Sequence, residues 1–130
     1  MMFRFDIEPM GAVRMTQRGK FVKGNASRYL QYKNAIATMA LQSSQEPTLA
    51  ACGVKIRFIM PIPKSWSKKK QLAAIGQPHI SKPDIDNLIK GCFDAVNGLI
   101  WKDDNQVVDV QAVKVYGEQP GIEMEVFELF

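Results

Sequence analysis

The 130-residue sequence fits one domain, and a chain of this length can bury a hydrophobic core without disulfides or a structural metal. Its 46% hydrophobic and 23% charged residues are typical of a soluble globular protein, and no apolar run reaches the roughly 18 to 20 residues of a membrane span. The charged N-terminus is unlike a secretory signal, so we expect a cytoplasmic protein without a membrane partner.

The net charge of +4 is the balance of two opposite halves. Residues 1–82 carry fourteen basic and three acidic side chains, whereas residues 83–130 carry three basic and ten acidic ones. The basic half permits a polyanionic partner such as nucleic acid. The acidic half needs a separate explanation.

Cysteine and histidine are scarce, which excludes several kinds of site. Cys52, Cys92 and the single histidine, His79, cannot supply the four ligands of a structural zinc site. A Ser-His-Asp or Cys-His site would have to use His79, which lies in a predicted loop, and we expect neither. Cys92 falls on an apolar helical face, where we predict a buried, inert thiol.

The first predicted element is a strand. Apolar and polar residues alternate from Phe3 to Ile7, and Pro9 ends the pattern. Residues 10–28 are rich in glycine and basic side chains, which predicts a loop or loose hairpin.

A helix follows, capped by Asn25 or Ser27 and running to about Gln42. Tyr29 and Tyr32 lie in its apolar stripe. Aromatic residues in such a stripe more often pack in a core than stack on bases, so we predict core positions.

The second predicted strand covers residues 54–60, where apolar residues alternate with Lys55 and Arg57. A short helix then begins at Ser65 and ends at Gly76, with a run of three lysines in its first turn. The lysine run is either a solvated face or a phosphate-binding surface.

The third predicted helix has Asp84 as its N-cap and runs to about Val96. A turn at residues 101–105 leads to a valine-rich strand over residues 107–116 and a final strand over residues 122–126. The order of elements predicts one α+β domain over residues 1–130, with helices packed on a mixed sheet.

Four aspartates form two close pairs on either side of this helix: Asp84, Asp86, Asp103 and Asp104. If the helix start and the later turn meet in space, oxygen-only ligands with open positions suit Mg²⁺, or Mn²⁺ in its place. Such a site cleaves phosphodiesters without histidine or cysteine. Alternatively, the first pair caps the helix and the second pair belongs to an ordinary turn.

Lys90 is the only basic residue between Lys82 and Lys102, and it follows Asp86 by four positions on the same helical face. It forms either a salt bridge with Asp86 or a contact with the scissile phosphate beside the metal. Gly91 is costly inside a helix, which indicates close backbone approach there.

Three sequence blocks at fixed spacing carry a family resemblance. Residues 82–98 read KPDIDNLIKGCFDAVNG and residues 101–107 read WKDDNQV. The pattern D-x-D-N-L-x-K, then F-D-A-hydrophobic, then D-D-x-Q-V resembles the signature of the RusA family of Holliday junction resolvases. The length and element order of the chain are similar as well.

The resemblance implies a Mg²⁺-dependent endonuclease, encoded by a phage or prophage, that nicks four-way DNA junctions symmetrically as a homodimer during recombination and repair. By motif, Asp84, Asp86 and Asp104 match the family's essential aspartates and Lys90 its essential lysine. Asp103 matches a neighbouring acidic position and is a further candidate metal ligand. We expect DNA contacts from seven basic residues, Arg14, Arg18, Lys20, Lys23, Lys68, Lys69 and Lys70.

Size also favours a dimer. One small domain with one carboxylate cluster cannot make two symmetric cuts, whereas two copies about a two-fold axis match the symmetry of a junction. Two alternatives remain at this point: a metal-dependent nuclease for flaps or other branched DNA, and a non-catalytic nucleic-acid-binding protein whose aspartates only cap the helix.

Overall fold

The computed structural model describes residues 1–14, 24–43 and 45–129. Its elements, in chain order, are β1 (Met2–Phe5), α2 (Gly24–Leu41), β2 (Ala51–Pro61), α3 (Lys68–Ala74), α4 (Ile85–Val96), the 3-10 helix η1 (Asp104–Gln106), β3 (Val107–Gly117) and β4 (Gly121–Leu129). The strands form a sheet in the order β1-β4-β2-β3, with β2 and β3 parallel and the other neighbours antiparallel. The predicted α+β domain with a mixed sheet is confirmed.

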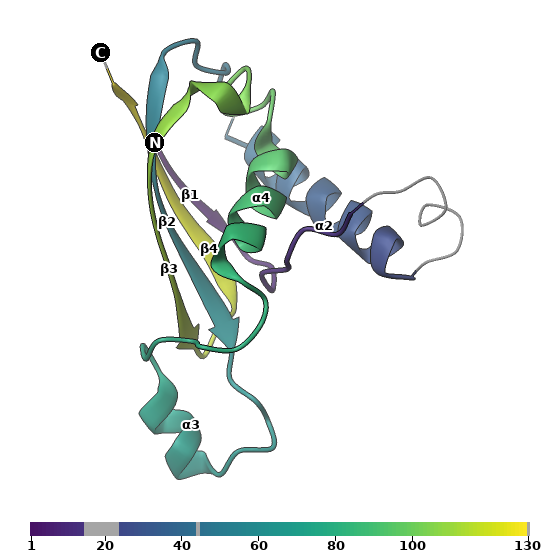
Figure 1. Ribbon diagram of the computed structural model, residues 1–130, viewed down its shortest axis with the longest axis vertical. Helices are drawn as coiled ribbons and strands as arrows, with labels where there is room; N and C mark the ends of the chain where they lie inside the picture. The colour runs from purple at the N-terminus through teal and green to yellow at the C-terminus, as the bar shows by residue number, and fades with distance from the viewer. Residues whose placement is uncertain (15–23, 44, 130) are drawn as a thin grey trace.

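Helices α2 and α4 cover one face of this sheet (Figure 1). Because side chains alternate along a strand, one row of β2 faces the helices, and its residues are at most 3% exposed: Val54, Ile56, Phe58 and Met60. Tyr29 and Tyr32 of α2 are buried in the same core, as predicted, so they do not offer a stacking surface for bases. Cys92 of α4 is also fully buried, and burial raises the pKa of its thiol to about 12.

Two predicted boundaries near the N-terminus were wrong. Strand β1 ends at Phe5, because the backbone then turns and the Ile7 amide donates to the Phe5 carbonyl at 2.9 Å. Helix α2 begins at Gly24, so Asn25 and Ser27 lie inside its first turn and are not caps. Asn25 instead accepts a hydrogen bond from the Arg28 guanidinium within that turn. Most of the predicted basic loop, residues 15–23, lies outside the described residues.

The segment after β1 crosses α4 near its start. The Ala12 amide donates to the Asn87 carbonyl at 3.1 Å, and a Cβ on Gly91 would lie 3.2 Å from the Met10 carbonyl oxygen. The predicted close approach at Gly91 is therefore confirmed. This contact places the beginning of the basic segment beside α4, the helix at whose start Asp84 and Asp86 lie. The segment includes Arg14, which is exposed.

Helix α3 lies beyond the end of the sheet at which β2 and β3 finish, and α4 runs back from that end along the sheet (Figure 1). Ser67 caps α3 by accepting a hydrogen bond from the Lys70 amide at 3.2 Å. The lysine run lies in the first turn, as predicted, but the helix begins at Lys68 and not at Ser65, because Ser67 is its N-cap. Among the described helices none has the length and apolar character needed to span a bilayer.

Candidate active site

Asp84 and Asp86 lie where α4 begins. Asp84 is the N-cap residue, as predicted, but its side chain makes no capping hydrogen bond. Asp86 stands in the first turn, and both residues are exposed. An N-cap aspartate usually accepts a hydrogen bond from a backbone amide of the first turn. The Asp84 carboxylate accepts no such bond, so capping does not occupy it. Among the described residues no ion pair involves either carboxylate.

Lys114 of β3 fixes the chain that leads into Asp84. Its ammonium donates to the carbonyl oxygens of Ser81 and Pro83, the latter at 2.7 Å. These charge-assisted bonds tie the segment immediately before α4 to the sheet. The position of Asp84 therefore depends on β3 as well as on α4.

Lys90 forms its ion pair with Asp94, at 3.3 Å, and not with Asp86 as the spacing from Asp86 suggested. Asp94 also accepts a hydrogen bond from the Tyr29 hydroxyl of α2 at 3.4 Å. Burial, assisted by the charge of Asp94, raises the pKa of Tyr29 to about 12, so this hydroxyl keeps its proton near neutral pH. The Lys90 side chain is two-thirds exposed, at 66%, so its ammonium is accessible from solvent.

Asp104, at the start of η1, is held by a buried indole. The Trp101 Nε1–H donates to Asp104 Oδ1 at 2.7 Å, and Trp101 is fully buried against Phe93, with ring centroids 5.0 Å apart. Burial raises the pKa of Asp104 most; the Trp101 hydrogen bond and the Lys90 charge lower it, whereas the charges of Asp94 and Asp103 raise it. These effects place Asp104 in the same electrostatic environment as Lys90 and Asp94.

Gln106 holds the turn that contains Asp103 and Asp104 through side-chain hydrogen bonds. Its side-chain oxygen, Oε1, accepts a hydrogen bond from the Asp103 backbone amide at 2.8 Å. Its side-chain nitrogen, Nε2, donates to the backbone carbonyls of Thr48 and Ala50 at 2.8 and 2.9 Å. Gln106 thus links the turn to the segment before β2. The Asp103 side chain itself is exposed.

Replacing Gln106 tests this link. Gln106→Ala is expected to lower the free energy of unfolding by about 1 to 3 kcal/mol, because polar groups in a partly buried turn lose their partners. Asn105→Ala, an exposed neighbour in η1, is the matched control and should change stability little. Equal thermal shifts for both variants, measured by circular dichroism, would show that Gln106 does not hold the turn.

The predicted site residues therefore divide into two groups along α4. Lys90, paired with Asp94, lies within the electrostatic influence of Asp104, which neighbours Asp103, while Asp84 and Asp86 lie at the start of the helix. In the part of the chain that the structure describes, which includes all four predicted ligands, no three acidic, histidine or cysteine side chains are close enough to hold one metal ion. The donor chemistry, carboxylates with open coordination positions, fits a hard cation, but these residues alone do not form a complete cage.

Sequence reasoning missed three residues of this site: Asp94, Trp101 and Gln106. Asp94 follows Lys90 by four positions, a spacing that marks it as a partner on the same helical face. Trp101 and Gln106 flank the Asp103-Asp104 pair, but only the fold shows that their side chains hold it.

Comparison with known proteins shows the family of this chain. A protein-family model described as Endodeoxyribonuclease RusA matches residues 6–127, which include all four aspartates and Lys90. The chain belongs to the RusA endodeoxyribonuclease family. It is also 36% identical over 127 residues to the Bacillus subtilis (strain 168) protein named Uncharacterized protein YqaN, a match that covers 93% of this chain and 87% of that protein. The family resemblance drawn from the motifs is confirmed.

The RusA family assignment identifies the chain as an endodeoxyribonuclease, which needs a surface for DNA phosphates. Lys68, Lys69 and Lys70 are exposed on α3, and the Lys70 ammonium lies 4.0 Å from the Trp66 ring centroid. Trp66 in turn packs on Tyr116 of β3, so this cationic group is supported by the sheet. Arg18, Lys20 and Lys23 lie outside the described residues.

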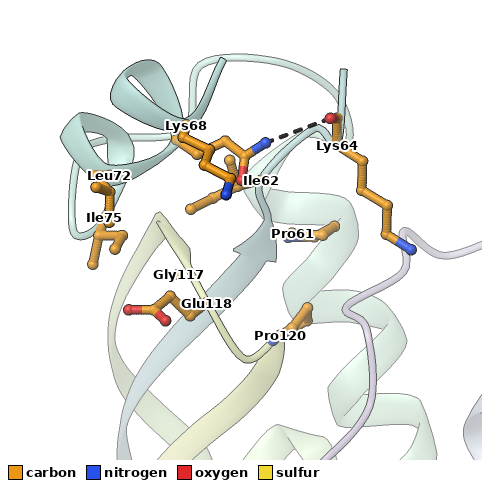
Figure 2. Close-up of a pocket in the computed structure, with 10 residues that line it drawn as sticks. Pro61, Ile62, Lys64, Lys68, Leu72, Ile75, Gly117, Glu118 and Pro120 are labelled. Atoms are coloured by element: carbon orange, nitrogen blue, oxygen red, sulfur yellow. Dashed lines mark hydrogen bonds between the residues drawn. The ribbon is translucent and has the colours of Figure 1, made fainter. Parts of the chain in front are cut away.

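A pocket of about 520 Å³ lies between α3 and the turn that joins β3 to β4 (Figure 2). Figure 2 shows Leu72 of α3 and Ile75, which directly follows this helix, with Lys68 above them and Glu118 of the turn below. None of the four aspartates lines this pocket. The candidate site residues along α4 and η1 therefore lie outside this pocket.

His79 does not form a catalytic site in the described part of the chain. It is buried and packs against Tyr116, with ring centroids 4.8 Å apart, and its Nδ1 has no hydrogen-bond partner among the described residues. Burial and the charge of Lys114 lower its pKa, which favours the neutral form.

Proposed function

We propose that the chain is a Mg²⁺-dependent endonuclease, active with Mn²⁺ as well, that resolves four-way DNA junctions by paired symmetric nicks. In this proposal it acts as a homodimer in DNA recombination and repair, in the cytoplasm of a bacterial host and encoded by a phage or prophage. Membership in the RusA family supports the nuclease activity and directs the proposal to junctions.

One observation carries the proposal beyond the family name: the Asp84 side chain does not cap α4. The non-catalytic alternative needs this aspartate, with Asp86, to serve the helix. Because the Asp84 carboxylate is exposed and makes no capping hydrogen bond, its placement supports ligand binding more than helix stabilisation.

Asp84, Asp86 and Asp104, with Asp103 as a further candidate, would hold the cation together with substrate oxygens. The cation, when bound, supplies polarisation of the phosphoryl group and a water of lowered pKa. Trp101 orients Asp104 by binding one of its oxygens. Asp94 holds the Lys90 ammonium beside Asp104, where the ammonium can contact the phosphate whose charge increases in the transition state.

The DNA strands would follow the basic residues near the start of α4. Arg14 belongs to the segment that crosses the start of α4, and Lys68, Lys69 and Lys70 extend the surface on α3. We assign Arg18, Lys20 and Lys23 to the same surface by sequence. Contacts of this kind set affinity and make it fall steeply with salt.

The test is cleavage of a labelled four-way junction by wild-type protein in Mg²⁺, in Mn²⁺ and in EDTA. Paired symmetric nicks in the two metals and no product in EDTA are expected. Equal cutting of a flap substrate would overturn junction resolution in favour of general branched-DNA cleavage. Junction binding without cleavage in either metal would overturn catalysis and leave a binding module.

Asp84→Asn and Asp86→Asn are expected to bind the junction in EDTA at least as tightly as wild type, because each removes a negative charge that faces phosphate. Fluorescence anisotropy with a labelled junction measures this. The effect on helix stability should be small, about 0.3 to 1 kcal/mol from the helix dipole. A clear loss of affinity together with a lower melting temperature would mean that the aspartates act mainly as caps.

A further inference from the structure

Strand β3 is an edge strand of the sheet, and only part of its outer edge is covered. Residues 76–79 run beside its C-terminal part: the Gly76 amide donates to the Tyr116 carbonyl, the Tyr116 amide to the Gln77 carbonyl, and the His79 amide to the Lys114 carbonyl, at 2.8, 3.0 and 3.1 Å. Among the described residues no backbone segment covers the outer edge before Lys114.

The direction of the free backbone groups follows from these bonds. Alternate residues of a strand direct their amide and carbonyl groups to the same edge. Lys114 and Tyr116 use the outer edge, so Val110 and Ala112 also direct their backbone groups outward, as far as the irregularity at Val108, the residue between the partners of Cys52 and Gly53. We call residues 108–112 the open window of β3.

The open window lacks the features that usually protect a sheet edge. It contains no proline or lysine, and its only charged residue is Asp109. Val108 is 64% exposed and Val110 is 40% exposed, and Val110 lies on the face of the sheet that carries the helices, beside buried Val54. An exposed apolar edge of this kind is a template for pairing with another strand.

We propose that the open window pairs antiparallel with the open window of a second copy, about a two-fold axis through Val110. A two-fold axis perpendicular to the sheet keeps each side chain on its own face, so facing residues must be an even number of positions apart. Centring on Val110 places Val110 opposite itself and Val108 opposite Ala112. The two Val110 residues then form a hydrogen-bonded pair at the axis.

The window is self-complementary in this register. Asp109 faces Gln111, so no like charges oppose each other, and the exposed Val110 side chains of both copies meet on one face. The pairing is limited at the start of β3 by η1, which precedes the strand. It is limited at the end of β3 by residues 76–79, which already occupy the outer edge there. The open length therefore fits a second copy of the same window.

This pairing gives the proposed homodimer an interface, and its link to junction cleavage rests on the proposed function. The perpendicular two-fold axis places both copies of α4 on the same face of a continuous sheet. Both aspartate sets then face one side of the dimer and are related by the symmetry that a four-way junction offers.

A symmetric disulfide tests the axis directly. In the proposed register the two Val110 Cα atoms lie about 5.5 Å apart, within the range that a disulfide spans. Val110→Cys is therefore expected to cross-link under mild oxidation. Val113→Cys is the control: it is more exposed, at 51%, but the two copies would lie about 20 Å apart and stay unlinked. The native Cys52 and Cys92 are buried.

A charge at the axis gives an independent test. Val110→Lys brings two ammonium groups together and is expected to weaken dimerisation at least tenfold, measured by light scattering, while Val113→Lys stays dimeric. Circular dichroism confirms that both variants fold. A monomeric wild type, or a dimer in which Val110→Cys does not cross-link, would overturn the interface.

The interface and the proposed function can fail separately. A cross-linked Val110→Cys dimer that leaves junctions uncut in Mg²⁺ supports the interface and overturns the function. Normal junction cleavage by a dimer that neither Val110 variant affects supports the function and overturns the interface.

Discussion

Asp104→Asn is expected to lower the rate of junction cleavage at least about a thousandfold, which corresponds to about 4 kcal/mol of lost transition-state stabilisation. Asparagine keeps an oxygen that can accept the Trp101 hydrogen bond but loses the negative charge that a cation needs. Single-turnover cleavage of a labelled junction in Mg²⁺ measures the change.

The Asp104→Asn substitution should lower the cleavage rate without lowering the thermal stability. The pKa of Asp104 is raised in the folded protein, chiefly by burial, so ionisation of Asp104 opposes folding. The free energy of unfolding therefore falls as pH rises through that raised pKa. Near neutral pH, the ionised Asp104 makes the folded protein less stable than it would be with a neutral side chain. Removing the charge should leave the melting temperature at pH 7 unchanged or higher.

Two matched variants serve as comparisons for the cleavage rate of Asp104→Asn. Glu118→Gln makes the same change of charge at an exposed turn away from the aspartates and should cleave at the wild-type rate. Asp103→Asn distinguishes the two neighbours in the turn: a loss as large as that of Asp104→Asn would make Asp103 an equal ligand. A thousandfold loss accompanied by unfolding would contradict the assignment of Asp104 to the metal.

Most elements could be predicted because their periodic patterns are local. Helix α4 follows the prediction closely: Asp84 is its N-cap, Val96 its last residue, and Gly98 adopts the positive φ of 81° that glycine allows after a helix. The start of α2 could not be predicted in this way, since Asn25 and Ser27 are good caps by type but lie inside the helix.

The partner of Lys90 shows where local reasoning ends. Asp86 and Asp94 are both four residues from Lys90, so spacing alone allows either ion pair. Tyr29, from a helix far away in sequence, donates to Asp94, and Asp104 adds its charge nearby. The tertiary structure therefore selects Asp94, which no pattern within α4 could decide.

The charge polarisation of the sequence is partly neutralised by the fold. On the face of the sheet away from the helices, Arg4 pairs with Glu123 at 3.4 Å, and Lys55 stands opposite Glu125 in the ladder between β2 and β4. These contacts join the basic half of the chain to the acidic half. They neutralise part of the positive charge counted over residues 1–82.

Trp101→Phe is expected to reduce junction cleavage about 10- to 100-fold, the usual cost of removing a group that orients a metal ligand. Phenylalanine keeps most of the aromatic packing against Phe93 but cannot donate to Asp104 Oδ1. Because that hydrogen bond lowers the pKa of Asp104, its loss should raise the pKa further. The acid limb of the pH–rate profile should then move to higher pH, where the carboxylate is ionised.

Phe93→Leu separates positioning from packing. Phe93 contacts the same indole but makes no hydrogen bond to Asp104 in the described structure, so its replacement should lower the melting temperature and leave the acid limb in place. Trp101→Phe should show both effects. If it lowers only the melting temperature, with the rate and the acid limb unchanged in the folded fraction, then Trp101 supports the core alone and Asp104 needs no indole to orient it.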